Sequence, residues 1–234
     1  IEEIFNNNSE VPPEYLAGNR EIKNTCYIVV TSCRGLCGGF NNNIIKEAEK
    51  DFHEDWEKPV IVAIGTKGKE YFEKRGYEIY KEYLAPPEDI SFLETREMSK
   101  PIIDMYDRGE IDEIVLIYTG FKNSIEQEVK NVILLPFDIQ PDPDVLIHDQ
   151  EVEYEPSVEE VFNYLVPKYV EMMIYAAVVE SATCEHAARR LAMENATDNA
   201  SDMLGSLSQY YNRARQAEIT DEIIEIVAGA EAQK

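Results

Sequence analysis

Residues 32–41, which read SCRGLCGGFN, place two cysteines inside a glycine-rich turn that directly follows an apolar run. A segment of this kind is compatible with three kinds of site. It can be a phosphate-binding loop, a metal or redox pair formed by Cys33 and Cys37, or a tight corner between a strand and a helix. Each alternative needs particular neighbouring residues, so the flanking sequence allows them to be compared.

The residues after the turn do not favour a phosphate site. A P-loop continues from its last glycine into Lys and then Ser or Thr, because the ammonium contacts the phosphates and the hydroxyl contacts magnesium. Here Gly39 is followed by Phe40 and Asn41. Gly35, Gly38 and Gly39 also lack the G-x-G-x-x-G spacing of a dinucleotide site. Nucleotide binding is therefore a weak interpretation of this segment.

A metal or redox site is also poorly supported. Structural zinc sites normally combine duplicate C-x-x-C pairs, or Cys with His. Cys33 and Cys37 are separated by three residues, and His53, His148 and His186 form no ligand pair in the sequence. No Ser/His/Asp set or pair of acid–base carboxylates stands out either. We therefore predict no catalytic, metal-binding or cofactor-binding residues, with Cys37 filling a small apolar gap beside a tight turn formed by Gly35, Gly38 and Gly39.

The composition is that of a protein with an ordinary hydrophobic core. The 234 residues are 44% hydrophobic and 29% charged. The longest apolar runs are much shorter than the roughly 20 residues that cross a bilayer. Four cysteines are too few for a disulfide-built domain of this size, so they are expected to be thiols in a reducing cytoplasm. The net charge of -24 argues against nucleic-acid binding, which requires clustered Lys and Arg.

Short apolar runs alternate with helical patterns between residues 22 and 155. We expect strands at 26–32, 59–65, 77–84, 113–121 and 128–137. We expect helices at 41–56, 67–76 and 90–109, the last containing Pro101. Strand–helix alternation is typical of an α/β layer with parallel strands. Residues 22–155 are therefore predicted to form a Rossmann-like α/β domain with a largely parallel sheet.

Residues 156–234 are predicted to form one long C-terminal helix of a coiled-coil shaft. Ser157 and Glu160 form a capping-box pattern, and a helical pattern then continues for about 70 residues, or roughly 105 Å. Apolar residues recur at alternating steps of three and four, which marks a left-handed coiled coil. This seam comprises Phe162, Leu165, Tyr169, Met172, Ala176 and Val179, then Ala196, Ala200, Met203, Leu207, Tyr210, Ala214 and Ala217.

A coiled-coil helix requires a partner helix. Within these 234 residues no second helix of comparable length is predicted. We expect the partner to be an N-terminal helix that precedes residue 1 in the same polypeptide, with residues 1–21 as its remnant and linker. A helix of another protein is the alternative.

Several motifs resemble the gamma subunit of F-type ATP synthases, the central rotor shaft. The turn SCRGLCGGFN is similar to that family's S-D-R-G-L-C-G-G-x-N corner, with Cys33 in place of the acidic residue. Residues 196–200 match its A-T-D-N-A motif, although Glu194 and Asn195 stand where a lysine is usual. Residues 211–230 match Y-N-x-A-R-Q-A-x-I-T-x-E-[IL]-x-E-I-V-x-G-A. The resemblance runs along the whole chain, without the family's N-terminal helix.

The resemblance implies a non-catalytic rotor subunit that couples ion flow through a membrane ring to conformational changes of catalytic beta subunits. It implies alpha, beta and epsilon subunits and the c-ring as partners, with no cofactor, no nucleic acid and no small-molecule substrate. The expected location is peripheral, on the cytoplasmic face of a bacterial membrane. The resemblance implies that the α/β domain sits at the foot of the rotor, against the epsilon subunit and the membrane ring, and residues 149–156 are expected to contribute to that contact. The implied site residues are a latch to the beta subunit at Arg215 and Gln216, and a shaft tip at Ile219, Ile223, Ile226 and Val227.

Two other interpretations remain open from the sequence. One is a free-standing Rossmann-like nucleotide-binding protein that dimerises through a helical arm. The other is a coiled-coil scaffold without a rotary role.

Overall fold

The computed structural model describes residues 12–18, 21–52, 59–123, 126–138, 155 and 157–232. The chain divides into two compact units, Ile1–Arg189 and Arg190–Lys234. The turn-rich segment at 141–145 lies outside the described residues, and so does nearly all of the segment 149–156.

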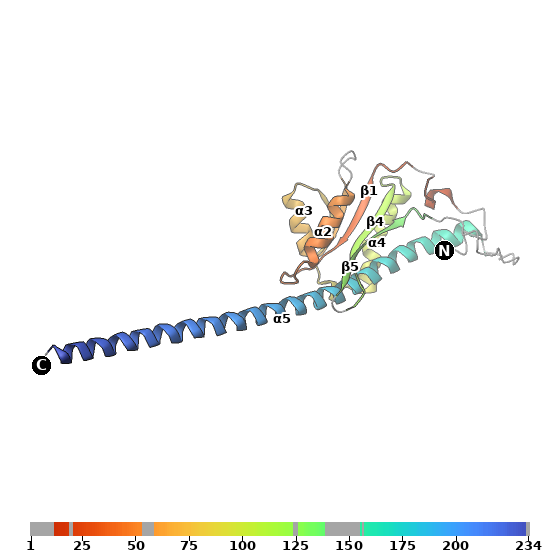
Figure 1. Cartoon of the computed structure of the whole chain (residues 1–234). Helices are drawn as coiled ribbons and strands as arrows, with labels where there is room; N and C mark the ends of the chain where they lie inside the picture. Colours follow the sequence, from red (N-terminus) through yellow and green to blue (C-terminus); the bar gives the residue numbers. More distant parts are fainter. Residues whose placement is uncertain are drawn as a thin grey trace. The chain divides into compact units, whose positions relative to one another are not determined.

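The first unit is built on a five-stranded sheet with the order β3-β2-β1-β4-β5. Its strands are β1 (Thr25–Val30), β2 (Val60–Ile64), β3 (Ile79–Tyr83), β4 (Glu113–Phe121) and β5 (Gln127–Leu135). Figure 1 labels three of these strands, β1, β4 and β5. Strands β3, β2, β1 and β4 are parallel, whereas β5 pairs antiparallel with β4. The predicted largely parallel sheet is therefore confirmed. The strand order reverses between β1 and β4, which makes that pair the switch point of the sheet.

The predicted helices are also confirmed, with slightly shorter bounds. They are α2 (Phe40–Asp51), α3 (Thr66–Lys74), α4 (Phe92–Asp107) and α5 (Val158–Glu231), with short 3-10 turns η1 (Pro13–Tyr15) and η2 (Pro87–Asp89). Ser91 caps α4, because its hydroxyl accepts a hydrogen bond from the Glu94 amide while the Glu94 carboxylate accepts one from the Ser91 amide. Pro101 lies inside α4 without ending it.

Side chains from the two faces of the sheet enter two separate cores. Every residue of β1 is buried, as expected for a central parallel strand. Cys26, Ile28 and Val30 face the core formed with α4 and the first part of α5. Tyr27 and Val29 face the core formed with α2 and α3. The helices therefore cover both faces of the sheet, as the doubly wound topology requires.

The first part of α5 belongs to the core of the sheet domain. Phe162, Val166, Val170 and Ile174 recur every four residues and are completely buried. The prediction that Phe162 belongs to a seam facing a partner helix was therefore wrong. Tyr169, another predicted seam residue, packs its ring against Phe137 at 5.4 Å. This helix has one face for the sheet and a second face, which includes Met172 at 62% exposure, that remains open.

Residues 12–18 pack against the same domain. The ring of Tyr15 stacks on that of Tyr106 at 6.2 Å, and the Tyr106 hydroxyl donates a 2.7 Å hydrogen bond to the Glu14 carbonyl. Leu16 forms an isolated parallel bridge with Phe137. These contacts attach the described N-terminal segment to the sheet domain.

Candidate functional site

The second unit of the chain is the exposed part of α5. Nearly every residue from Met193 to Glu231 is exposed in the structure. This segment contains large apolar side chains, among them Met203 (66% exposed), Leu207 (57%) and Tyr210 (70%). Single proteins rarely leave a continuous apolar surface of this kind in water. The segment is therefore a surface suited to contact with another polypeptide segment.

The predicted seam, latch and tip residues of the second unit all lie on this exposed segment. The seam positions from Ala196 to Ala217 are exposed, and so are the side chains of Arg215 and Gln216. The predicted tip residues lie near the C-terminal end of the helix, with exposures of 45% for Ile219, 55% for Ile223, 72% for Ile226 and 56% for Val227. The structure thus places these residues on one accessible helix.

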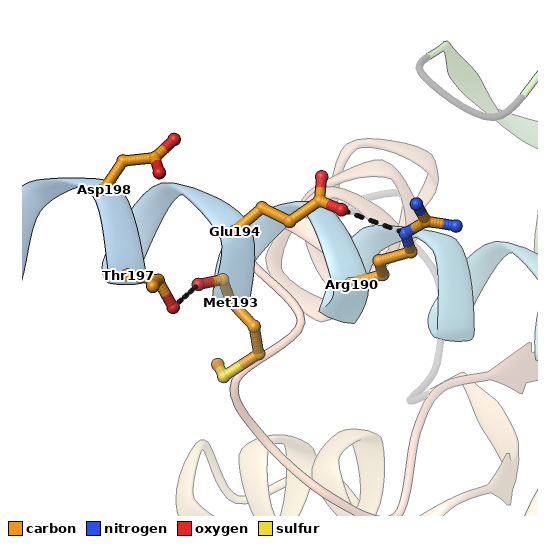
Figure 2. Close-up of a pocket in the computed structure, with 5 residues that line it drawn as sticks. All are labelled: Arg190, Met193, Glu194, Thr197 and Asp198. Carbon is orange, nitrogen blue, oxygen red and sulfur yellow. Dashed lines mark hydrogen bonds and ion pairs between the residues drawn. The ribbon is translucent and has the colours of Figure 1, made fainter.

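A shallow hollow near the start of this segment does not form an enclosed ligand site. Arg190 Nε donates a 3.0 Å hydrogen bond to Glu194, and the Thr197 hydroxyl donates a 2.9 Å bond to the Met193 carbonyl (Figure 2). Asp198 completes the lining, and all five residues are exposed. A ligand held here would remain in water on most sides. The hollow is therefore part of the same contact surface.

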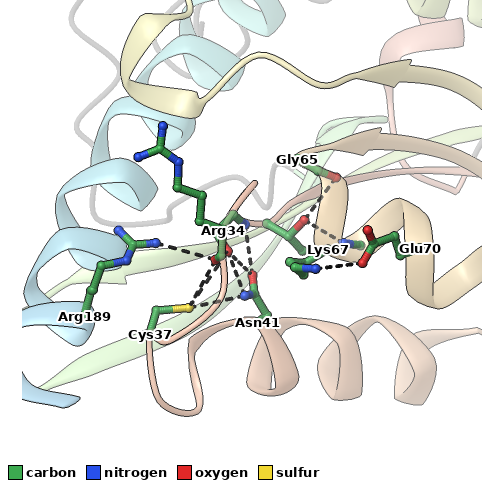
Figure 3. A network of polar contacts seen from close by, with 10 residues as sticks. Arg34, Cys37, Asn41, Gly65, Lys67, Glu70 and Arg189 are labelled. Carbon is green, nitrogen blue, oxygen red and sulfur yellow. Dashed lines mark hydrogen bonds and ion pairs between the residues drawn. The ribbon is translucent and has the colours of Figure 1, made fainter. Parts of the chain in front are cut away.

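The glycine turn of residues 32–41 is a structural corner between β1 and α2. The Ser32 amide donates a 2.9 Å hydrogen bond to Asn41 Oδ1, and Asn41 Nδ2 donates to Cys37 Sγ at 3.3 Å (Figure 3). Cys37 is 2% exposed and packs in the same core as Phe40 and Ile44. These contacts agree with the interpretation that Cys37 fills an apolar gap.

The turn also contains a backbone feature that the sequence did not reveal. Gly38 has a φ of 59°, as expected for a glycine in a tight turn, but Leu36 has a φ of 65°. Leucine rarely adopts this conformation, because its Cβ crowds the backbone. The Leu36 side chain is also 75% exposed.

Helix α5 contacts the edge of the sheet at which many α/β proteins bind ligands. In such folds the ligand lies beyond the carboxyl ends of the strands at the switch point, here β1 and β4. At this edge Gln127 Nε2 donates a 2.9 Å hydrogen bond to the Cys184 carbonyl. Arg189 Nη2 donates to the Arg34 carbonyl at 3.5 Å (Figure 3). Cys184 is completely buried, and this burial raises the pKa of its thiol to about 11.

An ion pair within α5 orients the Arg189 side chain that contacts the Arg34 carbonyl. Arg189 pairs with the carboxylate of Glu185, which is 4% exposed. The pairing raises the pKa of the Arg189 guanidinium, with the hydrogen bond to Glu185 as the main cause. The i, i+4 spacing of these residues is a signal in the sequence that could have predicted this pair.

The segment GTKGK at residues 65–69 serves packing between β2 and α3. Gly65 has a φ of 93°, and a Cβ placed on it would lie 2.1 Å from the Thr31 carbonyl oxygen. The Gly68 amide donates a 2.9 Å hydrogen bond to the Thr31 hydroxyl. Lys67 forms a 2.7 Å ion pair with Glu70 (Figure 3). The glycines are therefore explained by the close approach of Thr31.

Metal clusters and membrane-spanning helices are both missing from the described part of the chain. Its His, Cys, Asp and Glu side chains form no group of three or more suited to a metal ion. None of its helices has the length and apolar character needed to span a membrane.

These features define a class of protein: an α/β domain whose own C-terminal helix contacts the switch-point edge of the sheet and continues as a long helix with exposed apolar side chains. The family model of ATP synthase matches residues 1–233. The chain is 47% identical over 219 residues to the ATP synthase gamma chain of Alkaliphilus metalliredigens, covering 92% of this chain and 75% of that one. It is 38% identical over 239 residues to the gamma chain of Ruminiclostridium cellulolyticum, covering 99% and 81%.

A solved structure shows the same architecture. The central stalk and c-ring structure of the Tetrahymena thermophila mitochondrial ATP synthase contains a chain that aligns with a TM-score of 0.61 and 26% identity. The alignment covers 76% of this chain and 78% of that chain. The chain therefore belongs to the ATP synthase gamma chain family, and the resemblance found in its motifs is confirmed.

Proposed function

We propose that this chain is a non-catalytic rotor subunit of an ATP synthase. In this role it turns inside a ring of alpha and beta subunits and couples ion flow through the c-ring to conformational changes of the beta subunits. The observation that carries the proposal is the exposed surface of α5 from Met193 to Glu231, which is apolar at regular intervals. A rod of this kind is suited to transmitting rotation into a surrounding ring.

The seam of this helix requires a second helix along its length. Met203, Leu207 and Tyr210 are spaced as knobs of a two-stranded coiled coil and are all exposed. We propose that an N-terminal helix of the same polypeptide winds antiparallel around α5 and covers them. Winding two helices together stiffens the shaft, and a stiff shaft loses little rotation to twisting.

The two functional parts of the exposed segment have different chemistry. The tip residues Ile219, Ile223, Ile226 and Val227 form few directional bonds and suit rotation within an apolar sleeve. Arg215 and Gln216 suit an angle-dependent latch to a loop of the beta subunit, because charge-assisted hydrogen bonds from Arg are strong only in a narrow geometry. We propose that the latch resists rotation at particular angles.

The sheet domain is the proposed foot of the rotor. It would contact the epsilon subunit and the c-ring, with residues 149–156 contributing to that contact. In this proposed arrangement the protein would lie peripherally on the cytoplasmic face of a bacterial membrane. The contacts of Arg189 and Cys184 at the switch-point edge argue against the alternative of a free-standing nucleotide-binding protein, because they lie at the edge where a nucleotide would bind.

Reconstitution of the full-length subunit with alpha and beta subunits tests the proposal. The subunit should co-purify with them in a fixed ratio and restore coupled ATP hydrolysis. We expect Arg215→Ala to lower coupled synthesis and hydrolysis about tenfold, as for the loss of one charge-assisted hydrogen bond, with assembly retained. Arg213→Ala is the matched control, since its guanidinium lies 5.9 Å from the Tyr210 ring on the same helix. Equal rates for both variants would contradict the proposal that Arg215 forms a latch. Tight ATP binding by the sheet domain would instead favour a free-standing nucleotide-binding protein.

A further inference from the structure

Strand β5 is an open edge of the sheet. It is nine residues long and, among the described strands, pairs only with β4. Natural proteins usually protect a long edge strand with charges, prolines or a covering segment. The single basic residue of β5, Lys130, is directed elsewhere: its ammonium lies 3.3 Å from Glu180 of α5 and 5.4 Å from the Tyr118 ring centroid. The other charged residue of β5, Glu128, is engaged by Lys122 at 3.2 Å. Among the described strands, none pairs with the outer edge of β5.

A groove runs beside this edge on the face of the sheet that carries α2. It has a volume of about 500 Å³, and Val115, Asn131 and Ile133 contribute to its lining. Ile133, which pairs with Val115 in the register of β4 and β5, is 50% exposed. Helix α2 covers Tyr27 in the same sheet but leaves Ile133 open. The groove thus combines an apolar floor with an open strand edge.

The walls of the groove are negatively charged. Asp51, at the end of α2, lines it together with Glu113, at the start of β4. Glu113 is 8% exposed and accepts a 3.0 Å hydrogen bond from the Thr25 hydroxyl, and none of the described lining residues is Lys or Arg. Burial, followed by the charges of Asp51 and Glu113, raises the pKa of the Tyr27 hydroxyl, which donates a 2.9 Å hydrogen bond to the Asp51 carbonyl. A cation is the complementary group for this end of the groove.

We propose that β5 and its groove bind an extended, basic segment of another subunit of the rotor. The segment adds to the sheet as a further strand, places an apolar side chain over Ile133, and places a Lys or Arg against Asp51 and Glu113. In strand addition the backbone hydrogen bonds supply affinity, and alternate side chains supply specificity. The inference rests on the proposed function, since it requires the chain to be part of an assembled complex.

Photo-crosslinking in the assembled complex tests this site. The probe is p-benzoylphenylalanine at position 133 of the full-length subunit, and the matched control is the same probe at Tyr80, which is 45% exposed on the opposite edge strand β3. We expect the probe at 133 to label an extended segment of a different subunit that contains Lys or Arg. The control should not label that segment. Mass spectrometry of the product identifies the labelled residues.

A second variant tests whether the acidic wall of the groove attracts a basic residue. Asp51→Asn should lower the cross-link yield at position 133 about two- to fivefold, as for one partly exposed ion pair, whereas Asp89→Asn on η2 should not change it. Labelling of lipid, of a helix or of this same chain would overturn the inference, and so would an absence of labelling. Co-purification of these variants with alpha and beta subunits is a separate readout. A complex that assembles without the cross-link refutes this site alone, whereas failure to assemble counts against the proposed function.

Discussion

The substitution Arg189→Met removes the positively charged partner of the buried Glu185 carboxylate. The guanidinium pairs with Glu185, whose side chain is 5% exposed, and donates to the Arg34 carbonyl in the glycine turn. The Met side chain preserves most of the volume but cannot neutralise the carboxylate. One oxygen of Glu185, Oε2, has no hydrogen-bond partner among the described residues. The variant therefore leaves a carboxylate buried without its main compensating group.

The expected cost follows from this burial. Removing one partner of a fully buried ion pair costs about 3–5 kcal/mol. The Arg189 side chain is 25% exposed, so water screens part of the interaction. We therefore expect Arg189→Met to lower the free energy of unfolding by about 2–3 kcal/mol. The 3.5 Å contact with the Arg34 carbonyl is long and should add little to this loss.

Hydrogen exchange of β1 and β4 amides measures this loss, because these central strands open only with the whole domain. The double variant Glu185→Leu/Arg189→Met should recover most of the stability, since an apolar pair leaves no buried charge. Arg190→Met is the control: its pair with Glu194 is exposed, and its loss should cost about 0.5 kcal/mol or less. Equal stability of Arg189→Met and Arg190→Met would refute the reasoning, and so would a double variant no more stable than Arg189→Met.

Three further predictions concern individual residues. Gly65→Ala should lower the free energy of unfolding by about 2–5 kcal/mol, because its Cβ would meet the Thr31 carbonyl; a normal melting temperature would contradict this. Gly205→Ala, on the exposed helix with no neighbour near its Cβ, should raise helix stability by about 1 kcal/mol in a thermal melt, and a decrease would contradict its exposure. Iodoacetamide should modify Cys33 well before Cys26, which is fully buried and whose pKa burial raises to about 12, and equal labelling by peptide mass mapping would argue against this core.

The sheet was predictable because its strands carry their own signal. β1, β2 and β4 are apolar on both faces, as parallel strands covered by helices must be, and the sequence shows this without knowledge of the contacts. The bounds were less accurate, since the end of a helix depends on its cap. Thus α2 ends at Asp51, before the predicted end at residue 56, and residues 53–56 of that prediction lie outside the described part of the chain.

The features that the sequence did not reveal depend on distant residues. The heptad pattern predicts one buried face for α5, but Phe162, Val166 and Val170 bury a second face against the sheet. Which residues of α5 form this second buried face depends on where the sheet packs against the helix. Gly65 is required by Thr31, which lies far away in the sequence. The i, i+4 spacing of Glu185 and Arg189 allows their ion pair to be predicted from the sequence. The hydrogen bond from Arg189 to the distant Arg34 carbonyl could not be predicted in this way.

The burial of the first part of α5 has a mechanical consequence. Because Phe162, Val166, Val170 and Ile174 are part of the hydrophobic core, the helix cannot slip against the sheet without opening that core. A load applied to the exposed end is thus resisted by the cooperative stability of a whole domain rather than by a surface contact. The anchorage should fail in one step, when the domain itself unfolds, and not by gradual sliding.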